Sequence, residues 1–201
     1  MTLTVIGAGG HAHVVVSTAL AAGFKSIQIV DGSVARHGKS ILGCPIIGDF
    51  DLFDPSKGPA VIAIGKNDVR QKVAKSFPQA EWATLIYHFT WIDPSVRIGE
   101  GTVVFAGVVI QPEAVIGHHC IINTGSSVDH ECVLNDFAQV APGARLGGNV
   151  KMGEGAFVGI GASVHQGACM GAWATLGGGG FLKGSLDAGL TAVGVPARPR
   201  E

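Results

Sequence analysis

The sequence predicts two domains in series: an α/β domain with a half-sized Rossmann-like sheet, then an all-β domain wound as a parallel β-helix. Three observations predict this order. A six-residue repeat runs without a break from residue 96 to residue 182, a glycine turn joins an apolar strand to a helix near the amino terminus, and the α/β pattern is complete by about residue 88. We therefore expect domains at 1–88 and 89–182, followed by a carboxyl-terminal tail at 183–201.

The repeat places one small and one aliphatic residue on the inside of each hexad. The small series occupies every sixth position from Val96 to Ala174, and the aliphatic series follows two residues later, from Ile98 to Leu182. A period of six fits neither a helix of 3.6 residues per turn nor a simple strand of period two. It is typical of a hexapeptide β-helix, in which three hexads make one triangular coil of 18 residues, so the run corresponds to about five coils.

Composition and charge exclude several classes of partner. The 201 residues include 14 Lys and Arg and 15 Asp and Glu, a net charge of −1, whereas a nucleic-acid partner requires a basic face. Gly, Pro or a charge interrupts every apolar run well before the roughly 18 residues of a membrane span, and Met1–Val5 lacks the positive start of a signal peptide. We expect a soluble cytoplasmic protein with no membrane partner.

The four cysteines indicate neither disulfides nor a metal site. Cys120 and Cys132 occupy small inward slots of the repeat, where a thiol acts as a compact apolar group. Cys44 and Cys169 have no partner at metal-like spacing. We predict four free thiols, no metal ion and no cysteine nucleophile.

The amino-terminal domain approximates a nucleotide-binding fingerprint. Residues 3–6 and 27–30 read as strands, separated by a glycine turn and by a helix that ends at Gly23. In the G-x-G-x-x-G/A pattern, Ala12 takes the third slot, and Asp31 is placed to meet a ribose hydroxyl. Further strands are expected at 61–64 and 83–86, with a helix at 68–76.

Ligands of such sheets lie outside the carboxyl ends of the strands, which here means Gly9 to His11, Asp31 with Gly32, and Gly65 to Asn67. A half-sized sheet suits one nucleotide better than a dinucleotide. An NAD-dependent enzyme is the rival interpretation, and a glycine turn without any ligand is the simplest one.

One corner of the predicted coils has glycine in every turn. Stacking residues 18 apart brings together Gly107, Gly125, Gly143, Gly161 and Gly179. With strands about 4.8 Å apart, this column leaves roughly 20 Å of bare backbone. Turns that need a positive φ select glycine, but the other corner columns include His119, Phe137, Glu131 and Asn149. We therefore interpret the column as a groove for a thin ligand, such as the pantetheine arm of coenzyme A.

Asp129-His130-Glu131 is the second chemical feature of the repeat. Val128 points inward, so His130 projects outward, and it is the single titratable residue of its column, Pro94, Pro112, His130, Gly148 and Gln166. A lone outward histidine is often only a solvated turn residue. A neighbouring carboxylate that accepts from Nδ1 would instead leave Nε2 free as a base near neutral pH.

These features together resemble the bacterial sugar acetyltransferases of the bacillosamine, perosamine and sialic-acid O-acetyltransferase group, over nearly the whole chain. The resemblance rests on Gly-Ala-Gly-Gly-His at the start, Asp31, the stretch Ile122–Cys132 and Gly194-Val195-Pro196-Ala197. It implies a left-handed β-helix, acetyl-CoA as co-substrate, and a homotrimer that binds acetyl-CoA between adjacent subunits.

The resemblance also implies roles for single residues. His130 matches the general base, Glu131 the carboxylate that raises its basicity, and Asn123 a polar residue beside it. Nucleotide-sugar contacts are matched by Gly9, Gly10, His11, Asp31 and Gly65, and acetyl-CoA contacts by Ile160 and Gly178. Gln139 stands where related members have a histidine that touches acetyl-CoA, a departure from the family pattern.

We therefore expect acetyl transfer from acetyl-CoA to the amino group of a nucleotide-linked 4-amino-4,6-dideoxy sugar, with a backbone N–H of Gly143 or a neighbour stabilising the oxyanion. O-acetylation of a sialic acid or related sugar is the runner-up, and a non-catalytic β-helical module is a third interpretation. Outer-face aromatic residues favour assembly: Phe105, Phe137, Phe157 and Trp173. Pro196 and Pro199 disfavour a regular ladder, so we expect the tail to fold back over the last coil.

Overall fold

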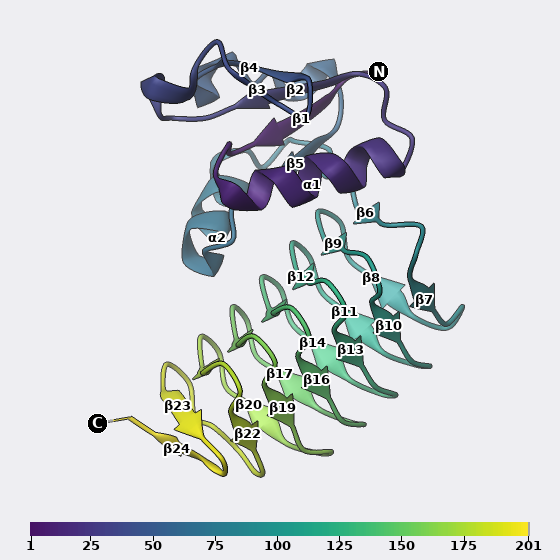
Figure 1. Cartoon of the computed structure of the whole chain (residues 1–201), viewed down its shortest axis with the longest axis vertical. Coiled ribbons are helices and arrows are strands. Elements are labelled where there is room, and N and C mark those ends of the chain that lie inside the picture. The colour runs from purple at the N-terminus through teal and green to yellow at the C-terminus, as the bar shows by residue number, and fades with distance from the viewer. Residues whose placement is uncertain (201) are drawn as a thin grey trace. The chain divides into compact units, whose positions relative to one another are not determined.

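The computed structural model describes residues 1–200 and divides the chain into two compact units, Met1–His88 and the part from Phe89 onward. Each unit has a hydrophobic core of its own. The first unit contains both α-helices, and the second is a stack of short coiled strands (Figure 1).

A parallel sheet with β1 inside it forms the first unit. β1 (Leu3–Ile6) pairs with β2 (Ile27–Val30) on one side and with β5 (Ala60–Ile62) on the other. The helices α1 (Gly10–Ala21) and α2 (Asn67–Ser76) follow β1 and β5. All four residues of β1 are buried, as expected for a strand covered on both faces. The predicted strand, turn and helix at the amino terminus are confirmed.

Two strands extend this sheet where the sequence pattern predicted none. β3 (Ser40–Ile41) and β4 (Cys44–Gly48) form an antiparallel hairpin, and β4 pairs in parallel with β2, which gives the order β3-β4-β2-β1-β5. The turn residues Leu42 and Gly43 both have positive φ, 49° and 81°. Two positive φ angles define the common two-residue hairpin turn, whose usual first residue is Asn or Asp. The leucine at that position conceals the hairpin in the sequence.

The two remaining predicted strands are shorter than expected. β5 ends at Ile62, and the chain then leaves the sheet in a loop before α2. β6 (Leu85–Ile86) keeps only half of the predicted segment 83–86 and is not part of the first unit's five-stranded sheet. The unit also contains three short 3₁₀ helices: η1 (Val34–Arg36), η2 (Phe50–Leu52) and η3 (Pro55–Lys57).

The second unit is a left-handed parallel β-helix whose strands are two residues long and stack 18 residues apart (Figure 1). Ile110, Val128 and Leu146, for example, are successive neighbours in one ladder. The three sides of the prism are the strand series β7-β10-β13-β16-β19-β22, β8-β11-β14-β17-β20 and β9-β12-β15-β18-β21. In chain order the strands are β7 (Trp91–Ile92), β8 (Arg97–Ile98), β9 (Val103–Val104), β10 (Val109–Ile110), β11 (Val115–Ile116), β12 (Ile121–Ile122), β13 (Ser127–Val128), β14 (Val133–Leu134), β15 (Gln139–Val140), β16 (Arg145–Leu146), β17 (Lys151–Met152), β18 (Phe157–Val158), β19 (Ser163–Val164), β20 (Cys169–Met170), β21 (Thr175–Leu176) and β22 (Phe181–Leu182).

Both inward series fill the interior of the prism. The aliphatic residues from Val104 to Met170 are at most 3 % exposed. A polar residue in one of the small inward positions forms a hydrogen bond inside the prism: the Thr102 hydroxyl donates to the carbonyl of Gly117 at 2.8 Å. Burial raises the pKa of Cys132 to about 11, so this thiol stays protonated inside the core. All four cysteines are free.

The carboxyl-terminal segment differs from the expectation. β23 (Thr191–Gly194) continues the third side of the prism in parallel with β21, and β24 (Ala197–Pro199) returns antiparallel to β23. The ladder therefore continues past residue 182. The prolines are tolerated because Pro196 lies between the two strands and Pro199 ends an edge strand, where its missing N–H breaks no further ladder bond.

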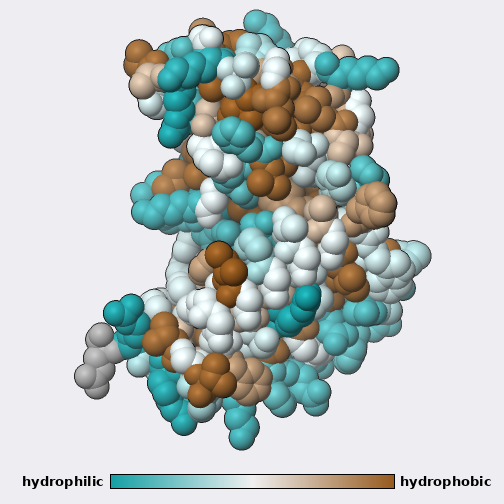
Figure 2. Space-filling model, in the orientation of Figure 1, coloured by the Kyte–Doolittle hydropathy of each residue, from teal (hydrophilic) through white to brown (hydrophobic). Residues whose placement is uncertain are grey.

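The aromatic residues expected on the outer faces are partly covered within the chain itself. Phe105 and Phe137 are buried, and the Phe137 ring stacks on His119 at a centroid distance of 5.2 Å. The apolar surface of the coils visible in Figure 2 is divided into small patches among polar residues. Neither described helix has the length and apolar character needed to cross a bilayer.

Candidate functional site

In the first unit, six residues of the predicted ligand segments, Lys66 among them, line one pocket of about 410 Å³. The pocket opens where β1, β2 and β5 end, and its lining includes Gly9, Gly10, His11, Asp31 and Gly65. A side chain at Gly9 or Gly10 would meet nothing within 4 Å, so the backbone at the start of α1 is accessible. Helix amino termini favour negative charge. Gly32 is not in the lining.

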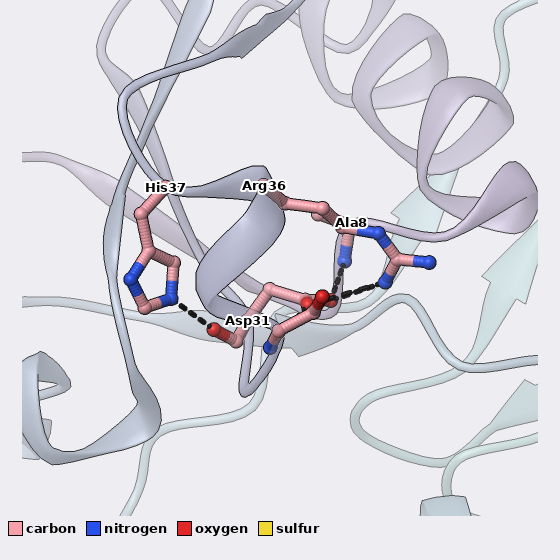
Figure 3. A network of polar contacts seen from close by, with 5 residues as sticks. Ala8, Asp31, Arg36 and His37 are labelled. Atoms are coloured by element: carbon pink, nitrogen blue, oxygen red, sulfur yellow. Dashed lines mark hydrogen bonds and ion pairs between the residues drawn. The ribbon is translucent and has the colours of Figure 1, made fainter.

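Asp31 joins the two turns that form this pocket (Figure 3). Its Oδ2 accepts from the N–H of Ala8 at 2.7 Å and its Oδ1 from the N–H of Ser33 at 2.9 Å. Nη1 of Arg36 contacts both oxygens, at 3.0 and 3.1 Å. Each carboxylate oxygen thus accepts two hydrogen bonds from the protein, so a ribose hydroxyl would have to replace one of them.

The charge state of Asp31 follows from these contacts. Burial opposes its ionisation, but the hydrogen bonds from the Ala8 and Ser33 N–H groups and the charge of Arg36 outweigh burial and hold the pKa of Asp31 below its usual value. His37 adds a contact of 2.7 Å between its Nε2 and the Asp31 carbonyl oxygen. The ionised carboxylate fixes Arg36 at the pocket.

Three basic residues lie in this pocket region: Lys66 falls in the predicted ligand segment from Gly65 to Asn67, whereas Arg36 and Arg70 were not predicted from the sequence. Arg36 and Lys66 belong to the lining, and Arg70 lies buried behind the loop that carries Gly65. Burial, with a contribution from the charge of Arg70, lowers the pKa of His11 to about 4, so the imidazole is neutral at pH 7. A basic residue five positions after Asp31, close to the end of the second strand, was the signal that could have identified Arg36.

In the second unit, His130 and Glu131 form a dyad at a corner of the prism. His130 Nδ1 lies 2.9 Å from Glu131 Oε2, and the backbone N–H of His130 donates to Asp129 Oδ1 at 2.7 Å. Glu131 has a left-handed backbone, φ 58°, which turns its side chain back toward the imidazole. With Nδ1–H donating to the carboxylate, Nε2 is left free.

Gly148 lies in the next coil, directly against the imidazole. A Cβ at Gly148 would overlap Nε2 and Cε1 of His130. Both residues line a pocket of about 370 Å³ with Asn149, Gln166 and Gly167. Within residues 1–200, the N–H of Gly148 donates to no protein acceptor. The residue that packs against the imidazole therefore has a free backbone donor.

The glycine column occupies a different corner of the prism. Its five members have φ between 64° and 73°, and a Cβ at Gly125, Gly143, Gly161 or Gly179 would meet nothing within 4 Å. Other corners adopt the same backbone with larger residues, including Phe137 at 60° and Trp173 at 61°. Neither crowding nor backbone geometry alone therefore explains an unbroken column of glycine.

Backbone bonding at this corner corrects one sequence expectation. The N–H of Gly143, expected to stabilise an oxyanion, donates to the carbonyl of Thr124 at 2.9 Å, and Gly161 and Gly179 are bonded to the preceding coil in the same way. The residues just before them differ, because the N–H groups of Ile160 and Gly178 donate to no protein acceptor in the described chain. Ile160 is 67 % exposed.

The predicted residues of the second unit thus fall into two groups. Asn123 lies two residues before Gly125 of the glycine corner and its Oδ1 accepts from the N–H of Thr124 at 2.8 Å, whereas Gln139 belongs to β15, the strand that precedes Gly143. His130 lies on the far side of β13 from Gly125. Five residues of extended chain span about 16 Å, so one chain does not bring the two corners together. The described residues include no cluster of three metal-ligating side chains.

Comparisons with known proteins agree over both units. Residues 2–77 match the family model of the PglD N-terminal domain. The acetyltransferase domain of PglB from Neisseria gonorrhoeae is 34% identical, with a TM-score of 0.92 and coverage of 99% of each chain. PerB from Caulobacter crescentus, solved in complex with CoA and GDP-perosamine, is 36% identical, with a TM-score of 0.93 and coverage of 100% of this chain and 98% of that one.

One further relative matches a smaller part of the chain. An uncharacterized protein of Acanthamoeba polyphaga mimivirus is 30% identical over 118 residues, which are 58% of this chain and 24% of that protein. The chain therefore spans about a quarter of the length of that relative.

Proposed function

The chain belongs to the hexapeptide-repeat sugar acetyltransferases, and on this premise we propose that it transfers the acetyl group of acetyl-CoA to the amino group of a nucleotide-linked 4-amino-4,6-dideoxy sugar. One observation supports the chemistry above all others. The imidazole of His130 is held by Glu131 at 2.9 Å, and its second nitrogen faces Gly148, a residue whose backbone N–H has no protein acceptor among the described residues.

Each of these groups has a role in direct transfer. Nε2 of His130 takes a proton from the sugar amine as the nitrogen attacks the thioester carbonyl. Glu131 keeps the imidazole in the tautomer that leaves Nε2 free and stabilises the imidazolium that forms. The N–H of Gly148 donates to the oxyanion of the tetrahedral intermediate, a role that the engaged N–H of Gly143 cannot fill. The intermediate then expels the coenzyme A thiolate, which leaves the amide.

The glycine corner is the proposed site for the pantetheine arm. A side chain at Gly143, Gly161 or Gly179 would project into open space, where it would obstruct an extended ligand. The free N–H groups of Ile160 and Gly178 provide donors for the amide oxygens of that arm. Because His130 is at another corner of the same chain, the thioester must reach it from a neighbouring subunit. We therefore propose a homotrimer with shared active sites.

The pocket of the first unit is the proposed site for the nucleotide sugar. The accessible start of α1, Arg36 and Lys66 supply positive charge for phosphate groups. GDP-perosamine in the complex of the related PerB is a ligand of this class.

Turnover of His130→Ala tests the proposal. A free-thiol assay with acetyl-CoA and a panel of UDP-, dTDP- and GDP-linked amino sugars first identifies an acceptor. Loss of the base should then lower kcat by about 10²- to 10⁴-fold. His165→Ala, which removes another exposed imidazole two coils further along the prism, should leave the rate unchanged. A His130→Ala variant that retains most of the rate would remove the dyad from the mechanism.

A further inference from the structure

Arg70 is the largest of the fully buried side chains among the described residues, with 1 % exposure. Its Nη1 donates to the carbonyl oxygens of Ile64 and Gly65 at 3.0 and 3.4 Å, and its Nη2 donates to Oδ1 of Asn67 at 2.9 Å. One guanidinium therefore holds three successive parts of the loop between β5 and α2. Ile64 and Gly65 from this loop line the pocket of the first unit, whereas Arg70 and Asn67 do not.

Burying a guanidinium for the sake of a loop is costly, because a charge loses much of its hydration in the interior. Two carbonyl oxygens and an amide oxygen could also accept from a neutral amide side chain, although more weakly than from a guanidinium. The charge itself points to a function, and its location is informative. Arg70 is close enough to His11 to help lower the pKa of that imidazole. His11 also lines the pocket, and its Cβ would lie 4.0 Å from a Cβ added at Gly65.

The pocket is thus positively charged from several directions. Arg36 and Lys66 stand in its lining, the start of α1 presents unshielded backbone, and Arg70 adds charge from behind the loop. The one carboxylate in the lining, Asp31, is paired with Arg36, so these two charges offset each other and the net positive charge comes from Lys66, the start of α1 and Arg70. Because the surroundings of Arg70 are dry, its field is screened less than that of a surface residue.

We propose that Arg70 is a positioning residue for the phosphate groups of the substrate: it fixes the loop around Gly65 and supplies a buried positive charge behind the pocket wall. This inference rests on the proposed nucleotide-sugar function and assigns part of its phosphate recognition to a residue that touches no ligand. The inference distinguishes two contributions of Arg70. If the role is electrostatic, losing the charge weakens the binding of each ligand in proportion to that ligand's charge. If the role is purely structural, losing it weakens the binding of all ligands alike.

Asn67→Asp is the sharpest test. The substitution keeps the size of the side chain and its hydrogen bond to Nη2 of Arg70, places a negative charge against the guanidinium, and suits the first turn of a helix. Calorimetry on the whole 201-residue chain first measures the Kd values of UDP, dTDP and GDP. The diphosphate that binds most tightly is then compared with its own uncharged nucleoside. The Kd of the diphosphate should rise about tenfold or more, and that of the nucleoside less than about twofold.

Two further variants complete the test. Arg70→Gln removes the positive charge and adds no negative one. Like Asn67→Asp, it should reduce the ratio between the Kd of the nucleoside and the Kd of the diphosphate. Arg70→Lys keeps the charge and should preserve this ratio. Lys72→Met, which removes one positive charge from the exposed surface of the same helix, should change neither Kd. Equal weakening of nucleoside and diphosphate by Asn67→Asp, or no weakening at all, would overturn the inference. If the wild type binds none of the three nucleotides, the nucleotide-sugar function itself fails.

Discussion

Gly148 is a glycine for a reason that lies in the preceding coil. Its position in the repeat is occupied by Pro94, Pro112, His130 and Gln166 in other coils, so the backbone there accepts ordinary side chains. Its φ is not in the left-handed region. What excludes a side chain is the imidazole of His130, which lies where the Cβ would be. Because Gly148 has no side chain, it leaves the space that the imidazole of His130 occupies.

We expect Gly148→Ala to lower kcat/KM by about 10²-fold, because a displacement of about 1 Å at a reacting group has effects of that size. In a His130→Ala background the same change should cost little, since no imidazole remains to be displaced. Kinetics of the wild type, both single variants and the double variant measure this coupling. Pro94→Ala, in the same slot three coils away, is the control, and equal losses in both backgrounds would contradict the explanation.

Residues were predictable from the sequence where their partners are close in the chain or fixed by the repeat. His130 and Glu131 are adjacent, and hexad counting alone directs them outward. Arg70 was not predictable, because a charge on a helix with few apolar residues looks solvent-exposed until the loop that covers it is known. The free N–H of Gly148 was missed because counting hexads predicts which residues stack but does not show which backbone N–H groups find an acceptor.

Among the elements, α1 links the pocket of the first unit to pH. Burial and the charge of Arg70 lower the pKa of His11, in the first turn of α1, to about 4 from an ordinary value of 6.5. Between these values the unfolded chain binds a proton that the folded chain does not. The folded state is therefore favoured fully above pH 6.5 and loses stability as the pH falls toward 4.

We expect this loss to reach about 3 kcal/mol, since one pKa unit corresponds to about 1.4 kcal/mol. An NMR titration of the His11 imidazole should give a pKa near 4, and hydrogen exchange of α1 amides should report the falling free energy of opening. His11→Asn should flatten that pH dependence. His13→Gln, at an exposed position of the same helix, should leave it intact. A His11 titration near 6.5 would contradict the buried, neutral imidazole.

Elements were predicted well where one period dominates. The hexad repeat fixed the inward residues of every coil, because each coil repeats the same chemical requirement. The hairpin β3–β4 was missed, because a two-residue strand leaves little periodicity and its turn contains Leu42 in place of Asn or Asp. At the carboxyl terminus the error was the opposite one, because a regular ladder was not expected and the structure has one. The two prolines were taken to exclude strand pairing, but an edge strand tolerates proline.

For the whole molecule, the separation between the two corners of the prism leads to a proposal about assembly. The dyad lies after β13 and the glycine corner before it, and we therefore propose that acetyl transfer uses the dyad of one chain and the groove of another. Exposed apolar residues on the second unit agree with such contacts, including Trp91 at 50 % and Ile160 at 67 % exposure. Light scattering should accordingly report a trimer at working concentrations.

Hybrid trimers test shared sites directly. Gly161→Trp should block the groove without unfolding the coil, because Trp173 adopts the same backbone at another corner and a Cβ at Gly161 meets nothing within 4 Å. Gly189→Trp, at an equally open positive-φ glycine outside the column, should leave activity unchanged. His130→Ala and Gly161→Trp should each be nearly inactive alone, for different reasons: one lacks the base, and the other cannot hold acetyl-CoA.

In trimers formed at random from equal amounts of these two variants, about one quarter of the interfaces combine an intact His130 with an intact groove. Co-expressed mixtures should therefore recover about a quarter of the wild-type rate per site, with a wild-type KM for acetyl-CoA. A site contained within one chain predicts no recovery, since no single chain in the mixture has both parts. Activity that stays at the level of the separate variants, in a mixture shown by mass spectrometry to contain hybrid trimers, would place dyad and groove in the same subunit.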